Sequence, residues 1–234
     1  MTTGGFPLGP VQAQANQEYD EIKIKFCIAD YRQIWWKYDR LARTAKDVFD
    51  TYAKQRNMHP LPLCTYRAKQ PESLERKMYR RKNNDLHTIL DLVGIRILLY
   101  FPDQAEQVEE MLDQCFENVY KKPRDGTSDY KACIYHITVK QRDMDDLVMP
   151  NQHTTVEVQV VSVLMHAWAE VEHERYKGIN DSTPEEDRLL EELNQIVLAG
   201  EKTLLRLHQL CEARKAKQKK SNAATIVLKD TTMS

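Results

Sequence analysis

The sequence has few glycines, scattered cysteines and no long apolar run. Its seven glycines form neither G-x-x-x-x-G-K-[ST] nor G-x-G-x-x-G, the loops whose backbone cradles phosphates. The five cysteines include no C-x-x-C pair, which fits a reducing compartment and disfavours a disulfide framework or a zinc knuckle. No segment approaches the ~20 apolar residues of a membrane span, and no basic stretch followed by an apolar one opens the chain. We therefore expect a cytoplasmic protein that would hold phosphates through side chains.

The chain is also nearly neutral. It has 234 residues and a net charge of −1, so it lacks the strong positive field that attracts nucleic acid or membrane surfaces. Its length suits a single domain with helical extensions. We expect residues 1–17 to be a disordered leader, residues 18–212 to be that domain, and residues 213–234 to be a basic, disordered tail.

Apolar periodicity predicts alternating helices and strands. Helical spacing runs from Tyr31 to Tyr52, and helices are also expected after Pro71 and over residues 103–116, 162–176 and 184–211. Thr183-Pro-Glu-Glu186 is a capping box that opens the last helix. Strands are expected at residues 92–101, 130–140 and 154–161, with a short one near Val119. The alternation predicts a mixed α/β (α+β) fold of three to five strands, packed by helices and extended by a long helix at each end.

Two carboxylates lie in or beside apolar strands. Asp91 precedes the strand Leu92–Phe101, and Glu157 lies inside Thr155-Val-Glu-Val-Gln-Val160. Strict alternation puts Glu157 and Gln159 on one face and the valines on the other. An unpaired charge in such a place costs several kcal/mol unless a cation or donor meets it. A shared metal ion is one reading; the other is that Asp91 caps its strand and Glu157 is solvated.

Cationic side chains are available for these carboxylates and for phosphates. They lie in Arg67-x-Lys69, on the following helix at Lys77, Arg80 and Arg81, at Arg96, and in the loop that holds Lys121, Lys122 and Arg124. A run of charge is often only a solvated face. Two acidic groups among many cations nevertheless describe a magnesium-dependent phosphate-transfer site. Tyr130 follows the basic loop and could stack a base.

The helix at residues 162–176 carries a second group of polar residues. His166, Glu170 and His173 share one face, since positions i, i+4 and i+7 align. A zinc site is disfavoured because H-E-x-x-H is absent and no fourth ligand is evident. We expect His173 to be buried and hydrogen-bonded, and His166 to border the pocket.

Taken in order, these motifs resemble the synthetase domain of the RelA/SpoT alarmone synthetases, over roughly residues 66–177. The pieces that carry the resemblance are Arg67-x-Lys69 with Ser73 and Lys77; Asp91-x-x-Gly94-x-Arg96; Tyr130 after a basic loop; Glu157-x-Gln159; and Trp168-Ala-Glu-Val-Glu-His173 with Tyr176. There is no His-Asp dipeptide and no large N-terminal region for the family's hydrolase domain. The chain is therefore expected to be a small, synthetase-only member with a nucleotidyltransferase-like fold.

The resemblance implies that the β,γ-pyrophosphate of ATP is transferred to the 3′-hydroxyl of GDP, GTP or GMP, with release of AMP. It assigns Asp91 and Glu157 to catalysis and Mg²⁺ binding, and Glu157 as the group that accepts the hydroxyl proton. It also implies a homo-oligomer built through the terminal helices. The remaining roles are ATP binding by Arg67, Lys69, Ser73, Lys77 and Arg96; acceptor binding by Lys121, Lys122, Arg124, Tyr130, His136, Gln159 and His166; and structural support by His173 and Tyr176.

The acceptor side departs from the family pattern. The family usually has a histidine four residues after the stacking tyrosine, but this chain has Ile134 there and His136 two residues on. The shift is even, so the side chain stays on the same strand face and His136 could substitute. The usual glycine before the tyrosine is also Asp129. Two alternatives stay open: transfer to an adenosine nucleotide or a tRNA 3′ end, and a nucleotide-binding regulator without catalysis.

Overall fold

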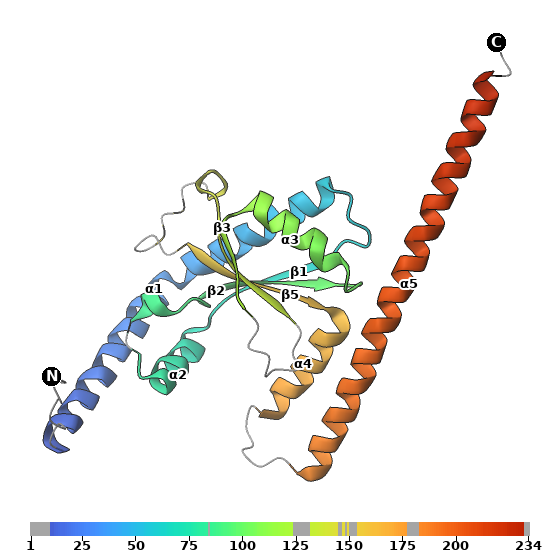
Figure 1. Cartoon of the computed structure of the whole chain (residues 1–234). Coiled ribbons are helices and arrows are strands. Elements are labelled where there is room, and N and C mark those ends of the chain that lie inside the picture. The colour runs from blue at the N-terminus through green and yellow to red at the C-terminus, as the bar shows by residue number, and fades with distance from the viewer. Residues whose placement is uncertain are drawn as a thin grey trace, which may run out of the picture. The chain divides into compact units, whose positions relative to one another are not determined.

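The computed structural model describes residues 10–83, 85–123, 132–144, 147, 149, 154–176 and 183–231, and it describes side chains from residue 19 to 173 within these ranges and from 183 to 218. A five-stranded sheet has the strand order β1-β2-β5-β4-β3 (Figure 1). The strands are β1 (Leu63–Ala68), β2 (Val93–Leu99), β3 (Glu117–Lys121), β4 (Cys133–Thr138) and β5 (Thr155–Ser162). The helices are α1 (Pro10–Gln55), α2 (Pro71–Arg81), α3 (Gln104–Cys115), α4 (Val163–Tyr176) and α5 (Pro184–Thr231). The mixed α/β prediction is confirmed.

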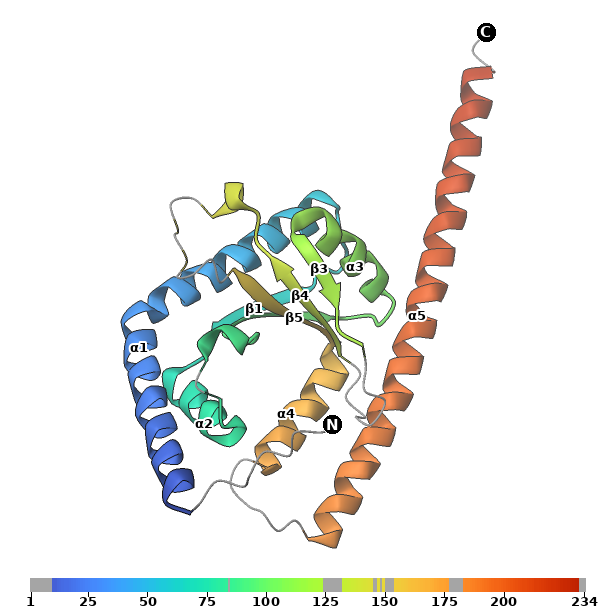
Figure 2. The same ribbon diagram turned by 60° about the vertical axis from the view of Figure 1, so that its left-hand side comes forward.

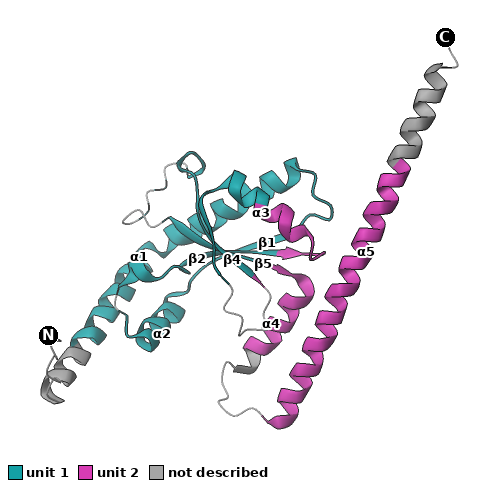
Figure 3. Ribbon diagram, viewed as in Figure 1, with its two compact units in different colours: residues 1–97, 110–123, 133–159 teal, residues 98–109, 124–132, 160–234 magenta. Residues whose placement is uncertain are grey.

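The chain divides into two compact units (Figure 3). The first contains residues 1–97, 110–123 and 133–159, and the second contains residues 98–109, 124–132 and 160–234. Most candidate site residues belong to the first unit, whereas α4 and α5 belong to the second. Over the described residues, no helix is long and apolar enough to cross a membrane.

Helix α1 packs against β1 and α2 in the first unit, and it lies beside α2 in both ribbon views (Figure 2). Its buried stripe begins at Ile24 and includes Tyr31, Tyr38, Leu41 and Phe49, each at most 3% exposed. The prediction that residues 1–17 form a disordered leader is wrong from Pro10 onward, because the helix already begins there. Residues 11–18 contain neither glycine nor proline and are rich in Ala and Gln, so they extend the helix readily.

The sheet follows the predicted alternation, with one addition. Val156 and Val158 are fully buried, whereas Glu157 and Gln159 on the other face are only partly covered. The added strand is β1, at one edge of the sheet; its buried positions, Cys64 and Ala68, are small residues that give only a weak apolar signal. Strand β4 begins at Cys133, and Tyr130, predicted to start it, lies outside the described residues.

In the second unit α4 packs against α5 around a core cluster that includes Met165, Trp168 and Val197. The predicted capping box opens α5: the Thr183 amide donates to Glu186 Oε2 at 2.7 Å, and the Glu186 amide donates to Thr183 Oγ1 at 3.2 Å. The helix continues to Thr231, so the disordered tail predicted from residue 213 is wrong to that point. Residues 213–220 are Ala, Arg, Lys and Gln, which are good helix formers.

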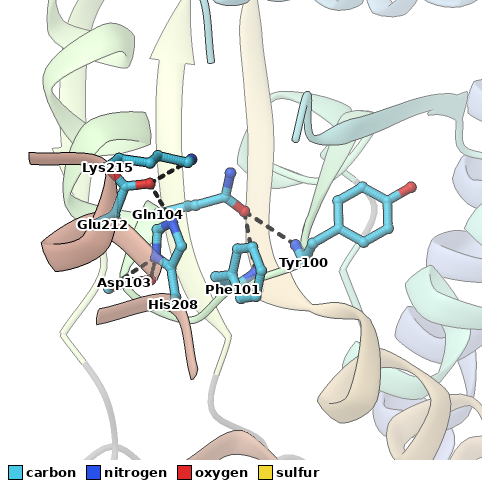
Figure 4. Close-up of polar contacts among 7 residues, drawn as sticks. All are labelled: Tyr100, Phe101, Asp103, Gln104, His208, Glu212 and Lys215. Carbon is cyan, nitrogen blue, oxygen red and sulfur yellow. Dashed lines mark hydrogen bonds and ion pairs between the residues drawn. The ribbon is translucent and has the colours of Figure 1, made fainter. Parts of the chain in front are cut away.

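Farther along α5, His208 binds the segment between β2 and α3 (Figure 4). The imidazole stacks on Phe101 with ring centroids 4.2 Å apart, and its Nδ1 lies 2.8 Å from Asp103 Oδ1. Gln104 closes the same segment, because its Oε1 accepts the backbone N–H groups of Tyr100 and Phe101. His208 therefore holds this segment through ring stacking on Phe101 and through a charge-assisted contact with Asp103.

We expect His208→Ala to lower the free energy of unfolding by about 2 kcal/mol, because it removes both the ring stacking and the contact with Asp103. The control is Gln209→Ala, which changes an exposed neighbour on the same helix and should cost less than about 0.5 kcal/mol. Urea unfolding measures both values, and amide exchange over residues 98–109 should accelerate only in His208→Ala. Equal effects of the two variants would contradict the role given to His208.

Candidate active site

The most strongly charged part of the first unit is Asp91 with two lysines. Lys69 follows β1 and donates to Asp91 Oδ2 at 2.8 Å, and Lys77 on α2 lies 2.6 Å from Asp91 Oδ1. The Lys77 contact is an ion pair rather than an aligned hydrogen bond, since Oδ1 has no aligned donor. All three side chains are at most 20% exposed. Asp91 is therefore paired with two lysines, both predicted from the sequence to bind phosphate.

The electrostatics of this triad follow from its burial. Burial alone would raise the pKa of Asp91, but the hydrogen bond from Lys69, the close contact with Lys77 and the charges of both lysines outweigh it and lower that pKa to about 2. Burial lowers the pKa of Lys77, and its ion pair with Asp91 opposes this effect. An anionic ligand would give both lysines a second negatively charged partner, so that their charges would no longer be compensated by Asp91 alone.

The second carboxylate belongs to a polar row that crosses the sheet. Gln159 Nε2 donates to Glu157 Oε1 at 2.9 Å, and Arg96 Nε on β2 donates to Gln159 Oε1 at 3.1 Å. On the other side, His136 Nε2 on β4 lies 3.9 Å from Glu157 Oε2. The two oxygens of Glu157 thus face different partners. His136 reaches the carboxylate although it stands two residues beyond the family's usual position.

Strand β2 brings this row close to the β1 edge. A Cβ on Gly94 would stand 3.5 Å from the Glu157 carbonyl oxygen and 4.0 Å from Arg67 Cγ. The Arg67 side chain therefore lies beside Gly94 of β2, on the face that also carries Arg96. Asp91 lies two residues before β2, and Glu157 lies on β5, the neighbouring strand of the same sheet.

The basic residues around this core are partly described. Ser73 is half-buried and accepts a hydrogen bond from Arg76 Nη2 at 3.1 Å, while Arg80 and Arg81 are exposed. Lys121 and Lys122 are exposed at the end of β3, and Lys121 Nζ lies 5.4 Å from the centroid of the Tyr135 ring. The predicted roles of Arg124 and Tyr130 fall on residues outside the described part of the chain.

The residues predicted on α4 belong to the second unit. His166 is partly covered, with Nδ1 3.7 Å from Glu170 Oε1. His173 is exposed, so the prediction of a buried, hydrogen-bonded histidine is wrong. The helical spacing placed His173 on the face of His166 but did not show which part of that face packs against α5. The Tyr176 side chain lies outside the described part, and over the described residues no three His, Cys, Asp or Glu side chains could hold a metal ion together.

Three aromatic residues contact the site without having been predicted there. Tyr31 and Trp35 on α1 both donate to the backbone carbonyl of Lys69, at 2.8 and 3.1 Å. Tyr120 stands opposite His136 in the β3–β4 register, with ring centroids 6.3 Å apart. Their sequence signal was limited to an apolar helix stripe and a short strand, because helical spacing does not reveal a contact with a residue more than thirty positions away.

The fold is α/β, and the candidate site brings lysines and carboxylates together in a chain that has no glycine-rich phosphate loop. Residues 66–181 match the family described as the region found in RelA / SpoT proteins. The resemblance drawn from the motifs is confirmed.

Relatives with assigned names agree with this placement. GTP pyrophosphokinase YjbM of Bacillus subtilis (strain 168) is 28% identical over 168 residues, which are 69% of this chain and 77% of that protein. The crystal structure of small alarmone synthetase 1 from Bacillus subtilis has a TM-score of 0.64 at 21% identity and covers 79% of this chain and 99% of its own. A second structure of small alarmone synthetase 1 from Bacillus subtilis, bound to its product pppGpp, has a TM-score of 0.60 at 21% identity and covers 77% and 97%. At this identity the structures establish the shared fold.

The triad predicts an acid-dependent stability. The pKa of Asp91 is about 2 in the folded chain and 3.8 ordinarily, so its ion pairs stabilise the fold fully above about pH 4 and are lost as the pH falls through 2. The free energy of unfolding of wild type should exceed that of Asp91→Asn by about 2 kcal/mol at pH 6 and by roughly half of that at pH 3. Urea unfolding at both pH values measures the gap. The control is the exposed Asp113→Asn, and a gap that does not change with pH would refute the assignment.

Proposed function

We propose that this protein is a (p)ppGpp synthetase, which transfers the pyrophosphate of ATP to the 3′-hydroxyl of GDP, GTP or GMP and releases AMP in the cytoplasm. The observation that carries the proposal is the half-buried Lys69–Asp91–Lys77 triad beside β1 and β2, together with the Glu157 row on the sheet, inside the RelA/SpoT region. The relatives' names support the same activity: one is a GTP pyrophosphokinase and one is a synthetase bound to pppGpp.

The donor side of the reaction follows from the triad. The lysines would turn from Asp91 to the phosphates of ATP, and Ser73 on the same helix would add a hydroxyl. Arg67 and Arg96, both on the site face next to Gly94, would stack on the adenine. Once its lysines engage phosphate, Asp91 has carboxylate oxygens available for a metal ion.

The residues also fit magnesium. Mg²⁺ is usually held by one or two carboxylates together with substrate phosphates, and Asp91 and Glu157 supply two. Bound there, the ion would neutralise charge that develops on the phosphate oxygens.

In this proposal Glu157 acts as the base. Its Oε1 is held by Gln159, which is held by Arg96, so the carboxylate has a fixed orientation with Oε2 toward His136. In the transfer, the acceptor 3′-oxygen forms a bond to the β-phosphorus of ATP while the bond to the bridging oxygen of the α-phosphate breaks. The hydroxyl proton passes to Glu157, and AMP leaves. Lys121, Lys122, Arg124, Tyr130, Gln159 and His166 are proposed to bind the acceptor.

The decisive measurement uses ATP labelled at the γ-phosphate, Mg²⁺, and GMP, GDP, GTP, ADP, AMP or tRNA as separate acceptors. We expect label on a guanosine nucleotide with an equal amount of AMP, and about 10²–10⁴-fold slower transfer by Glu157→Gln. Glu117→Gln, an exposed glutamate on β3, should be unaffected. If label appears only on an adenosine nucleotide or on tRNA, the acceptor is that molecule and not a guanosine nucleotide. If no AMP forms with any acceptor, the protein is a nucleotide-binding regulator without catalysis.

We also propose a homo-oligomer that forms through the terminal helices. Helix α5 exposes Leu189, Ile196, Leu207 and Leu210, which lie 51–62% exposed on one side of the helix. Helix α1 likewise exposes Tyr19, Ile22 and Phe26. Apolar rows of this kind on two long helices are typical of surfaces that a second copy covers.

Sedimentation velocity tests the oligomer. Ile196→Glu combined with Leu210→Glu should reduce the sedimentation coefficient toward that of a monomer, because it places charges in the proposed interface. The matched control is Arg206→Glu combined with Gln209→Glu, exposed positions of the same helix that belong to no apolar row. A monomeric wild type at micromolar concentration would contradict the oligomer and leave the catalytic proposal intact.

A further inference from the structure

Lys69 is held by its backbone as well as by its side chain. It lies in the short connection between β1 and α2, two residues before Pro71. Its N–H donates to the carbonyl of Leu92 at 2.8 Å. Its own carbonyl accepts two hydrogen bonds from α1, one from Tyr31 Oη at 2.8 Å and one from Trp35 Nε1 at 3.1 Å. Three hydrogen bonds therefore fix the main chain at the base of this lysine.

Tyr31 and Trp35 lie on α1 at positions from which both can reach the Lys69 carbonyl. Positions 31 and 35 are one helical turn apart, so both side chains point to the same side of α1. Tyr31 is 0% exposed, and its ring lies 5.0 Å from that of Tyr38. Burial, with smaller contributions from Tyr38 and Asp91, raises the pKa of Tyr31, so its hydroxyl keeps the proton that it donates. Both lone pairs of the Lys69 carbonyl are thereby used.

The position of the Lys69 ammonium depends on these bonds. A lysine side chain has four rotatable bonds, and it delivers charge to a defined point only when its base is fixed. The bond to the Leu92 carbonyl joins Lys69 to the residue next to Asp91, and the α1 donors hold the opposite side of the same peptide segment. The Asp91 carboxylate and the Lys69 ammonium are thus held next to each other in the absence of a nucleotide.

We propose that Tyr31 and Trp35 are positioning residues for Lys69, through which α1 becomes part of the ATP-binding site. The inference rests on the proposed function, which assigns Lys69 to the ATP phosphates. Neither aromatic residue touches the nucleotide in this scheme; they act through the lysine carbonyl. This role differs from general support of the fold, because it predicts a loss of ATP affinity that depends on Lys69 being present.

The test compares Tyr31→Phe, Trp35→Phe and the double variant with wild type. Each substitution removes one donor and keeps a ring, so the helix can still pack. Binding of a non-hydrolysable ATP analogue with Mg²⁺, measured by calorimetry, should weaken about tenfold in the double variant, because the lysine loses both restraints. The KM for ATP should rise similarly, and the KM for the acceptor should stay within about twofold.

Two controls separate positioning from stability. Tyr38→Phe removes a hydroxyl from the neighbouring buried tyrosine, and Trp36→Phe changes the adjacent tryptophan, which is 54% exposed. Both should leave affinity for the ATP analogue unchanged even where they lower Tm. In a Lys69→Met background the Tyr31 and Trp35 substitutions should have no further effect on that affinity, although their effect on Tm persists.

A measurement without nucleotide keeps this inference distinct from the proposed function. Amide hydrogen exchange at Lys69, whose N–H donates to the Leu92 carbonyl, should accelerate in the double variant because the peptide segment loses both α1 restraints, and it should be unchanged in Tyr38→Phe. If wild type binds no ATP analogue, the proposed function fails, but amide exchange at Lys69 still tests the positioning. Equal affinity and equal amide exchange in the double variant and wild type would overturn the inference, as would additive losses in the Lys69→Met background.

Discussion

The ion pairs of Asp91 with Lys69 and Lys77 are the constraint on which the candidate active site depends. They join the start of β2 to the β1–α2 connection and to α2 itself, three parts of the chain that meet only in the fold. Like charges on two half-buried lysines repel each other, and the carboxylate between them makes the arrangement stable. The same charges are what a polyphosphate and a divalent cation require, so one interaction both holds the unliganded site together and leaves it ready for exchange.

The sheet sets the position of the second carboxylate, Glu157. Arg96, Gln159, Glu157 and His136 come from three adjacent strands, and their side chains share one face because each strand alternates with a period of two. The row gives Glu157 one oxygen fixed by an amide and another next to an imidazole. It also explains how the shifted histidine reaches the site: an even shift along β4 changes the distance along the strand but keeps the face.

Much of this could be predicted, and the failures have physical reasons. Alternation over residues 155–160 predicted the open face of Glu157, and the motifs around Lys69, Asp91 and Glu157 indicated the family. His173 was expected to be buried because helical spacing places it beside His166, but spacing defines a face and not what covers it. The helices at the two ends of the chain extend beyond the predicted bounds, since their outer turns carry good helix formers without an apolar stripe, and periodicity depends on that stripe.

The sequence by itself determined the order of the helices and of strands β2 to β5, the capping box before α5, the faces of β4 and β5, and the set of charged residues that resembles the RelA/SpoT pattern. These are local properties, because strand period, helix period and capping act within a few residues. Only the tertiary structure decided that Lys69 and Lys77 share one carboxylate, that His136 stands beside Glu157, and that Tyr31 and Trp35 hold the Lys69 carbonyl. Each of these contacts joins residues brought together by packing, and the free energy of burying their charges and donors depends on neighbours that a linear sequence does not reveal.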